Sequence, residues 1–420
     1  MLTQQHLVIG INLNYMNNVQ EQHHCLACGS ENLELTLDLG SQPLANSYVK
    51  DITLIEDKYP LAVNLCKDCC HLQLTHIVDP QIIYKNYLYV AGTSKTLKDY
   101  SNWFANWVTE TSTRLTNRVL DIGCNDGSQL DSFKSIGWET WGVDPAENIY
   151  PTSSANHEVL CDFFGPDIIN KIDTSFDAIT AQNVVAHNPN PLAFLRTCHT
   201  LMNNNTMLYV QTSQATLVAN NEFDSIYHEH VNFFNIQSMS RLAARAGLTL
   251  VDAIKTPIHG TSYVYVFSKS LEAPAHMENV LAMESLDGLY NVERYATWRT
   301  VVEDNMRNLK TTLCKYQEDG FTIVGYGAAA KGNTLLNYID FKLDLIIDDN
   351  PLKQNLYTPG QHIPIVDSTA ITKFNKEDKI LFVPLAWNFF KEISSKIKAV
   401  RTNDNDVFLK YFPTVETVNV

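Results

Sequence analysis

The sequence predicts an α/β protein in which a small, cysteine-containing N-terminal module precedes two domains with mostly parallel sheets. Two observations carry this prediction. Two cysteine pairs stand near the N-terminus, and two separate stretches each combine an apolar strand, a glycine turn and a helix. Strands that alternate with helices are typical of parallel sheets covered by helices. A chain of 420 residues has room for two or three domains.

Composition narrows the classes of function. The formal net charge of −15 argues against a broad nucleic-acid-binding surface, although an anionic small substrate needs only a few local cations. No run of about 18 apolar residues indicates a membrane-spanning helix. Residues 1–22 are expected to form a loose extension and lack the features of a signal peptide. We therefore expect a cytoplasmic monomer that binds neither nucleic acid nor a membrane.

Residues 23–80 are expected to form a metal-binding module. Cys25 and Cys28 make one C-x-x-C pair, and Cys66 and Cys69 make the second. In a chain without a signal peptide, this pattern is typical of a metal site rather than of disulfides. Four thiolates give a closed tetrahedral zinc site with no open position for catalysis, so we expect the zinc to be structural.

Other interpretations of these cysteines stay open at this point. Cys70 and His71 follow the second pair directly and could compete as ligands. Redox-active pairs and inert thiols are the remaining alternatives.

The middle of the chain is expected to hold a helical connection, residues 81–117, and then a sheet domain, residues 118–274. The connection places large apolar side chains on one side of a helix, namely Leu97, Tyr100, Trp103, Phe104 and Trp107. The fourth, fifth and late strands of the sheet are expected near residues 176–181, 207–211 and 263–267.

A nucleoside-binding half-site is predicted within residues 118–145, which have the pattern strand, glycine turn, helix, strand. The turn contains Gly123, Asn125 and Gly127, and glycine allows a ligand to approach the backbone closely. Asp144 ends the second strand, about 20 residues after the turn, where a carboxylate suits two ribose hydroxyls.

The acidic residues of the turn indicate which kind of nucleoside it binds. A pyrophosphate-binding turn has the pattern G-x-G-x-x-G, whereas this one has two glycines and the carboxylates of Asp121, Asp126 and Asp131. Carboxylates repel a pyrophosphate but suit a cationic or zwitterionic ligand such as S-adenosylmethionine. We therefore assign Asp121 to the methionine end of that ligand and Asp144 to its ribose.

An adenine site is predicted after the third strand. Asp162 could accept a hydrogen bond from the adenine amino group, and Phe163 could cover the ring. Asn183, after the fourth strand, is assigned to the same cofactor site. The alternative interpretation is an ordinary α/β turn without a cofactor.

The last part of the chain is expected to contain a helical linker, residues 275–318, and a second α/β domain, residues 319–420. Its first strand is followed by a turn with Gly325, Gly327 and Lys331. The glycines would let a ligand approach, and the lysine at the start of a helix suits a phosphate. An ordinary turn with an exposed lysine is the alternative.

A candidate catalytic run follows the fifth strand. Tyr227, His228, Glu229 and His230 place four ionisable side chains in succession near the expected mouth of the nucleoside cleft. Such groups are costly to bury together and gather at functional sites. A metal site and a structural network are the alternatives, but the run lacks the i, i+4 spacing of a helical zinc motif.

Taken together, these motifs resemble the sugar C-methyltransferases that act on nucleotide-linked 4-keto-deoxyhexoses. The resemblance covers residues 25 to about 410 and rests on CLACG, CKDCC, YLYVAGTS, VLDIGCNDG, HNPNP, YHEH and GYGAAAKG, in that order. It implies a zinc module, then a Rossmann-like class I methyltransferase domain that binds S-adenosylmethionine, and then a second Rossmann-like α/β domain that helps to hold the nucleotide sugar.

The resemblance also implies roles for individual residues. It implies that Tyr87, Tyr89 and Ser94 line the sugar pocket and that Tyr227 to His230 form the catalytic run. Relatives often have tyrosine three residues after this run, where the present chain has Phe233. The hydroxyl lost there leaves the substitution pattern of the sugar open.

A mechanism follows from the chemistry of carbon methylation. A ketone becomes a carbon nucleophile when a base removes an α-proton and a donor stabilises the enolate oxygen. We expect His230 to be the base, because histidine titrates near neutrality. Tyr227 could donate to the enolate oxygen, Glu229 could bind a sugar hydroxyl or orient a histidine, and His187 is the alternative acid or base.

Three other functions are compatible with parts of the sequence. Methylation of oxygen or nitrogen on a sugar or small metabolite would not need an enolate. A nicotinamide-dependent oxidoreductase could use residues 325–332, which are followed by Asp348 and Asp349 but have no third glycine at the usual spacing. A non-enzymatic scaffold is disfavoured by the intact glycine turn and catalytic run.

Overall fold

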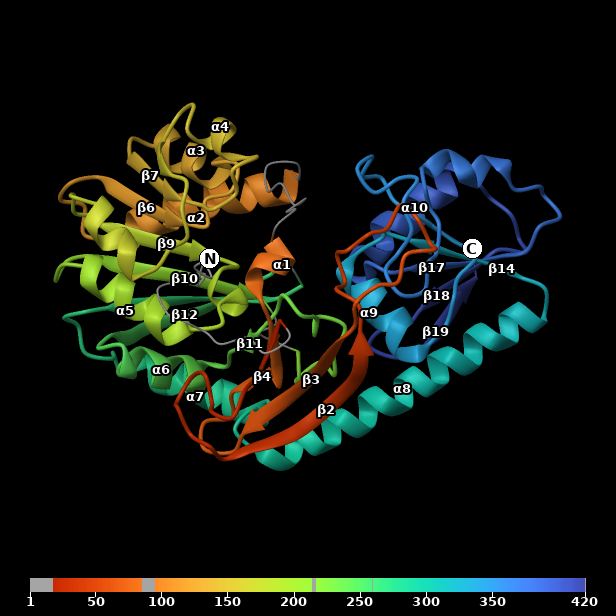
Figure 1. Ribbon diagram of the computed structural model, residues 1–420, viewed down its shortest axis with the longest axis horizontal. Coiled ribbons are helices and arrows are strands. Elements are labelled where there is room, and N and C mark those ends of the chain that lie inside the picture. Colours follow the sequence, from red (N-terminus) through yellow and green to blue (C-terminus); the bar gives the residue numbers. More distant parts are fainter. Residues whose placement is uncertain (1–17, 85–94, 214–216, 259, 420) are drawn as a thin grey trace, which may run out of the picture. The chain divides into compact units, whose positions relative to one another are not determined.

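Segments that are far apart in the sequence build each of two units in the computed structural model (Figure 1). The structure describes residues 18–84, 95–213, 217–258 and 260–419. The first unit comprises Met1–Glu34, Asn64–Thr216 and Glu229–Val292, and the second comprises Leu35–Val63, Leu217–His228 and Glu293–Val420.

The first unit contains a seven-stranded sheet in the order β12-β13-β10-β9-β6-β7-β8. The strands are β6 (Arg118–Ile122), β7 (Glu139–Val143), β8 (Glu158–Leu160), β9 (Ala178–Gln182), β10 (Met207–Ser213), β12 (Thr249–Thr256) and β13 (Ser262–Ser268). The strands from β10 to β8 are parallel, and β13 runs antiparallel to both of its neighbours. The strand order reverses between β6 and β9, so a ligand site is expected at the carboxyl ends of these strands.

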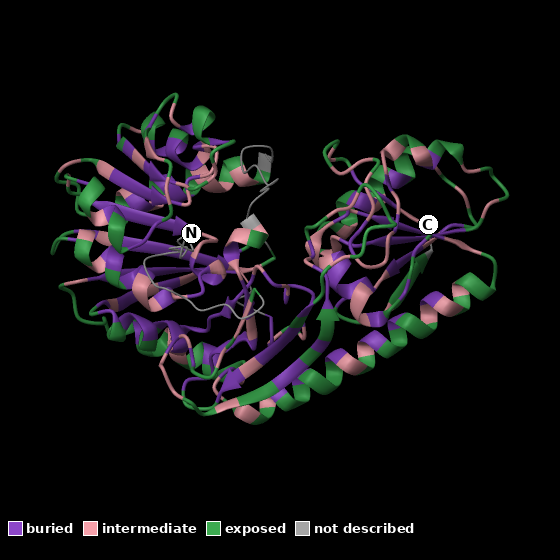
Figure 2. Cartoon of the chain, in the orientation of Figure 1, coloured by how far each residue is buried: buried purple, intermediate pink, exposed green. Residues whose placement is uncertain are grey.

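Helices cover both faces of this sheet. Because side chains alternate along a strand, Val119 of β6 joins the core under α2 (Lys95–Thr111) and α3 (Ser128–Ser135), whereas Leu120 joins the core under α5 (Pro191–Leu201) and α6 (Ile236–Arg245). The strands β6, β9, β10 and β13 are accordingly buried along most of their length (Figure 2). The remaining helices in the described part of this unit are α1 (Pro80–Tyr84), α4 (Tyr150–Ser153), α7 (His276–Leu286) and the short 3-10 helices η2 (Pro166–Lys171) and η3 (Val185–His187).

A smaller sheet contains the segments around the cysteine pairs. Its order is β11-β4-β3-β2, built from β2 (Leu33–Gln42), β3 (Tyr59–Cys66), β4 (Leu72–Leu74) and β11 (Asn232–Phe233). A separate two-stranded ladder pairs β1 (Val19–Glu21) with β5 (His76–Val78). The strand β11 pairs antiparallel with β4, so the segment after the candidate catalytic run lies directly beside the second cysteine pair.

The second unit contains a six-stranded sheet in the order β16-β15-β14-β17-β18-β19. Its strands are β14 (Thr322–Tyr326), β15 (Leu345–Ile347), β16 (Ile365–Val366), β17 (Ile380–Pro384), β18 (Val407–Lys410) and the antiparallel edge strand β19 (Glu416–Asn419). Its helices are α8 (Val292–Glu318), α9 (Ala330–Ile339), α10 (Phe390–Val400), η4 (Ser368–Lys373) and η5 (Trp387–Phe389). The strand order reverses between β14 and β17, which makes their carboxyl ends the expected ligand edge.

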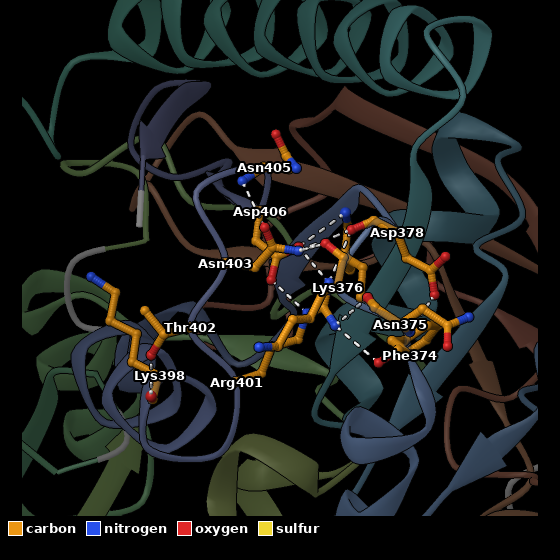
Figure 3. Close-up of polar contacts among 11 residues, drawn as sticks. Phe374, Asn375, Lys376, Asp378, Lys398, Arg401, Thr402, Asn403, Asn405 and Asp406 are labelled. Carbon is orange, nitrogen blue, oxygen red and sulfur yellow. Dashed lines mark hydrogen bonds and ion pairs between the residues drawn. The ribbon is translucent and has the colours of Figure 1, made fainter.

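A polar cluster lies at the amino ends of β17 and β18, at the end of this sheet opposite to the expected ligand site (Figure 3). The guanidinium of Arg401 pairs with Asp406 at 2.6 Å, and both side chains are buried. Arg401 also donates to the backbone oxygens of Phe374, Asn375 and Asp378. Since these bonds satisfy the buried charges and lie at the amino ends of β17 and β18, we assign the cluster to stability rather than to ligand binding.

The boundaries of the two units differ from the expected domains. Residues 35–63 of the expected zinc module group with the second unit. The expected linker becomes α7 and α8, and α8 buries one row of side chains, Tyr295, Trp298, Val302, Met306, Leu309 and Leu313. A helix with a buried row is part of a folded core rather than a free spacer. Among the described helices, none combines the length and apolar character needed to cross a membrane.

Candidate functional site

A cavity of about 1470 Å³ opens at the carboxyl ends of the parallel strands in the first unit. It exceeds the usual range of about 300–1000 Å³ for a small-molecule pocket, which leaves room for two ligands. Eight residues predicted from the sequence line it: Asp121, Gly123, Asn125, Asp126, Asp144, Phe163, Asn183 and His187. The predicted half-site and one candidate catalytic residue therefore share one cavity.

The glycine turn has the geometry that its sequence predicts. Gly123 has φ +72°, and a Cβ atom on it would lie 2.5 Å from Cγ2 of Val184. Gly127 has φ +83° at the start of α3, and a Cβ there would lie 3.0 Å from the ring of His157. Both positions thus require glycine. Gly127 does so for packing, since it is not among the residues that line the cavity.

The two carboxylates of the half-site are held differently. The Asp121 carboxylate accepts a 2.6 Å hydrogen bond from Thr180, and burial raises its pKa to about 7. Asp144 accepts from the backbone N–H groups of Asn125 and Ala146, both at 2.9 Å, and burial raises its pKa. A buried acid, Asp121, and a half-buried one, Asp144, face one cavity and favour a cationic ligand there.

The third predicted acid has another arrangement. The Asp162 carboxylate pairs with Lys171, accepts from the N–H of Phe163 at 2.8 Å and is not among the residues lining the cavity. Phe163 does line it and is 37% exposed, so its ring is available to cover a base. The ion pair between Asp162 and Lys171 is exposed and therefore weak, so the adenine contact of Asp162 stays a prediction.

Several cavity residues were missed by sequence reasoning. Gln182 donates to the side chain of Gln129 at 2.8 Å, and Gln129 donates to the backbone oxygen of Ser101 at 3.2 Å. All three residues and Gln211 line the cavity. Gln182 and Gln211 are polar residues near the carboxyl ends of otherwise apolar strands, and that signal could have identified them.

One histidine of the cavity wall, His187, packs against a second histidine, His230. The rings of His187 and His230 lie 4.8 Å apart between centroids at 65°. His187 lines the cavity, and burial lowers its pKa to about 4 despite a hydrogen bond to the backbone of Glu229. A ring with this pKa is neutral at pH 7 and a weak base, which argues against His187 as the group that abstracts the proton.

The other half of the candidate run belongs to the second unit. The boundary between the units falls between His228 and Glu229. The ring of His228 is buried, lies 3.3 Å from the backbone oxygen of Tyr59, and burial lowers its pKa to about 4. These contacts favour a structural role for His228. Tyr227 is half-buried and its proposed role stays a prediction.

The four predicted metal ligands come together in space. The sulfur atoms of Cys25, Cys28, Cys66 and Cys69 all lie within 4.8 Å of one another. The distances from Cys25 to Cys69 and from Cys28 to Cys66 are 3.6 and 3.5 Å, close to the edge of about 3.8 Å in a tetrahedron with Zn–S bonds of about 2.3 Å. Among the described residues, no other such cluster was found. The donor set fits a closed zinc site.

The second glycine turn differs from the expectation. A Cβ atom on Gly325 would lie 2.8 Å from Ile346 and 2.9 Å from Leu343, so glycine is needed there for packing rather than for ligand approach. Gly327 has φ +92° and is needed for the turn itself. Lys331 lies in the first turn of α9, with its amino group 4.0 Å from the Asp224 carboxylate.

The remaining predicted residues cannot be placed. Tyr87, Tyr89 and Ser94 lie outside the described residues.

Comparisons with known proteins match three successive parts of the chain. Residues 25–84 match the family model of a zinc binding domain, residues 97–253 that of a methyltransferase domain, and residues 257–413 that of the C-methyltransferase C-terminal domain. The order agrees with the modules expected from the motifs.

Individual proteins are similar to the whole chain or to part of it. The chain is 28% identical over 396 residues to C-methyltransferase NovU of Streptomyces niveus, which covers 90% of this chain and 93% of that protein. It is 25% identical over 202 residues to a ubiquinone biosynthesis O-methyltransferase of Neisseria meningitidis serogroup C, covering 43% of this chain and 84% of the relative. Magnesium protoporphyrin IX methyltransferase of Synechocystis PCC 6803, solved with bound S-adenosylmethionine, is 12% identical over 41% of this chain and 79% of its own, with a TM-score of 0.32.

Proposed function

Because this chain belongs to the S-adenosylmethionine-dependent C-methyltransferases with an N-terminal zinc-binding domain, we propose that its methyl acceptor is a nucleotide-linked 4-keto-deoxyhexose. The reaction would then belong to deoxysugar biosynthesis. The observation that carries the proposal is the pair of histidines at a cavity with room for two ligands.

Carbon methylation sets the chemical requirement. When bound, S-adenosylmethionine supplies an electrophilic methyl group on its sulfonium. The protein must turn a carbon of the acceptor into a nucleophile, and a 4-keto sugar offers acidic C–H bonds on either side of the ketone. His230 would take such a proton, and the resulting enolate carbon would bond to the methyl group as the methyl–sulfur bond breaks and the sulfur leaves as a neutral thioether. Tyr227 donates to the enolate oxygen, and Glu229 binds a sugar hydroxyl or orients a histidine.

The cofactor pocket supplies binding rather than chemistry. Asp121 holds the cationic amino group of the methionine end, and Asp144 holds the ribose. Phe163 covers the adenine, and Asn183 lines the same wall. The four-cysteine cluster has no open position, so the zinc has no part in the chemical step.

The substrate class is tested by incubating the enzyme with S-adenosylmethionine and a panel of nucleotide-linked sugars. We expect a product one methyl group heavier from 4-keto-6-deoxy members and none from the matching 4-hydroxy sugars, which cannot form an enolate. Methylation of the 4-hydroxy sugars would contradict the proposal.

Asp121→Asn should weaken S-adenosylmethionine binding by about 10- to 100-fold, the worth of a hydrogen bond to a charged partner. Because the pKa of Asp121 is raised to about 7, the wild-type acid must lose a proton to hold a cation. Wild-type affinity should therefore fall as pH drops below about 7, and the variant should lose this dependence. Calorimetric titration from pH 5.5 to 8.5 measures both.

The stability of the ligand-free protein is the control for this prediction. A carboxyl whose folded pKa lies above its unfolded value of about 3.9 costs stability as pH rises from about 4 to about 7. Asp121→Asn removes that cost and should raise the Tm at pH 8. A lower Tm together with weaker binding would instead indicate a damaged pocket.

Lys331→Met should raise the KM for the nucleotide-linked acceptor by about 10- to 100-fold without changing S-adenosylmethionine affinity, because it removes a cation from the phosphate. The Nζ atom of Lys331 lies 4.0 Å from the Asp224 carboxylate and 5.2 Å from the centroid of the Trp387 ring, near the carboxyl ends of the strands of the second sheet. Lys410→Met, which breaks an exposed pair with Glu416 in the same unit, is the matched control.

The Lys331 variant leaves a buried acid behind. Asp224 is 1% exposed and accepts from Trp387 at 2.8 Å, so losing its cation should lower stability. The double variant Asp224→Asn/Lys331→Met restores neutrality. A high KM in the double variant supports a phosphate contact, whereas recovery of the wild-type KM would show that only stability had changed.

A further inference from the structure

We propose that Asn232 is a positioning residue that couples residues 66–71, which contain the second cysteine pair and are called the knuckle below, to the loop bearing His187. This inference rests on the proposed function only for the role of His187 in the cavity. The contacts that carry it lie within the first unit.

The amide of Asn232 bonds in two directions. Asn232 is fully buried in β11, and its Oδ1 lies 3.2 Å from Nε2 of His71, two residues after Cys69. Its Nδ2 donates to the backbone oxygens of Asn188 at 2.8 Å and Val185 at 3.4 Å. One side chain thus joins the knuckle to both ends of η3, the short helix that ends at His187.

Backbone bonds reinforce the same path. The N–H of Val231 donates to the oxygen of Ala186 at 2.9 Å, and the N–H of Leu74 donates to the oxygen of Val231 at 2.9 Å. On the knuckle side, Nδ2 of Asn235 donates to the backbone oxygen of Cys70 at 2.6 Å. The segment after the candidate catalytic run therefore lies between the knuckle and the cavity loop.

The short helix needs this external support. It has three residues, and its own backbone bonds run only from His187 to Val184 and from Asn188 to Val185. A single turn of this kind is not stable alone. The asparagine fixes both ends, and so it sets where the His187 ring stands on the cavity wall.

His71 in turn sets the orientation of the amide. In the neutral tautomer with a proton on Nε2, His71 donates to Oδ1 of Asn232, so Nδ2 must face the two carbonyls. Without that donor the amide could rotate and place its oxygen against the carbonyl oxygens. The position of the knuckle therefore affects the position of His187 through His71 and Asn232. A structural zinc that orders the knuckle would in this way affect catalysis without contacting the substrate.

Amide hydrogen exchange on the zinc-bound protein tests the coupling without any acceptor. Asn232→Asp is nearly isosteric, but it replaces the donor by an oxygen that faces two carbonyls. We expect faster exchange in residues 183–190. Gln73→Glu is the matched control, because Gln73 is paired with Asn232 in register, is fully buried, and donates to His24 inside the module.

The control should speed exchange near residues 24–26 and leave residues 183–190 unchanged. If the amides of residues 183–190 exchange at the same rate in Asn232→Asp and in Gln73→Glu, the proposal is overturned. If Asn232→Asp fails to fold, His71→Leu removes the orienting donor and should give the same pattern. His71→Gln, which can still donate, should restore wild-type exchange.

Kinetics separate positioning from simple stability. Asn232→Asp should lower kcat by about 10- to 100-fold, because it displaces the His187 ring, against which the assigned base His230 packs, and a displacement of about 1 Å can have an effect of that size. The affinity for S-adenosylmethionine and the acceptor KM should stay within about threefold of wild type. Equal losses of kcat in Asn232→Asp and Gln73→Glu, in proportion to Tm, would contradict the proposal. Failure of every acceptor in the panel would leave the exchange result decisive.

Discussion

His230→Ala should lower kcat by about 10²- to 10⁴-fold, the usual contribution of a positioned general base. S-adenosylmethionine binding should be unchanged, because the cofactor contacts are assigned to Asp121, Asp144, Phe163 and Asn183 and not to His230. Exchange of the α-proton of the acceptor with deuterated water should be lost together with methylation. Rapid-quench turnover and calorimetric titration measure the two effects.

His187 is the rival base, and the same assays decide between the two. It lines the cavity, but its pKa of about 4 makes it a weak acceptor at pH 7. If His187→Ala abolishes α-proton exchange while His230→Ala keeps it within about tenfold of wild type, the assignment is wrong. His199→Ala, a histidine of α5 outside the cavity residues, is the control and should have little effect.

Cys69→Ser should unfold the zinc module and abolish activity. Structural zinc binding by four thiolates contributes about 10–16 kcal/mol, as much as the entire stability of about 5–15 kcal/mol of a typical protein. Cys25, Cys66 and Cys69 belong to the hydrophobic core that also contains Phe194 and Met239 from the helices over the main sheet, and Cys28 packs against this core. Loss of the metal should therefore spread beyond the module. Metal analysis, calorimetry and turnover measure the loss.

Cys70→Ser is the matched control, because Cys70 is adjacent and equally buried but does not belong to the four-sulfur cluster. It should keep one zinc per chain and most of the activity. If Cys69→Ser also kept its zinc and its Tm, the structural role of the cluster would be refuted.

Local patterns gave most of the sheet architecture. The strands expected near residues 176–181, 207–211 and 263–267 appear as β9, β10 and β13, because runs of buried, β-branched and aromatic residues mark them whatever their neighbours. The glycine turn and the four cysteines were also predicted. Their chemistry depends on spacing that the sequence shows directly.

Features that depend on contacts between residues far apart in the sequence could not be predicted. Nothing local to Asn232 indicates that it joins His71 to the loop of residues 185–188, since the partners lie 161 and 44 residues away. In the sequence, Gly325 cannot be distinguished from a glycine that lets a ligand approach. Only the structure shows that the side chains of Ile346 and Leu343 leave no room for a Cβ atom there. The division of the candidate catalytic run between two units likewise follows from tertiary contacts.

The position of the transferred methyl group tests the central claim most directly. A 4-keto-6-deoxy nucleotide sugar with a uniformly ¹³C-labelled ring is converted with S-adenosylmethionine labelled at its methyl carbon, and the product is examined by NMR. The account predicts one-bond carbon–carbon coupling between the new methyl group and a ring carbon next to the ketone. A methyl signal without that coupling would place the group on oxygen and contradict carbon methylation through an enolate.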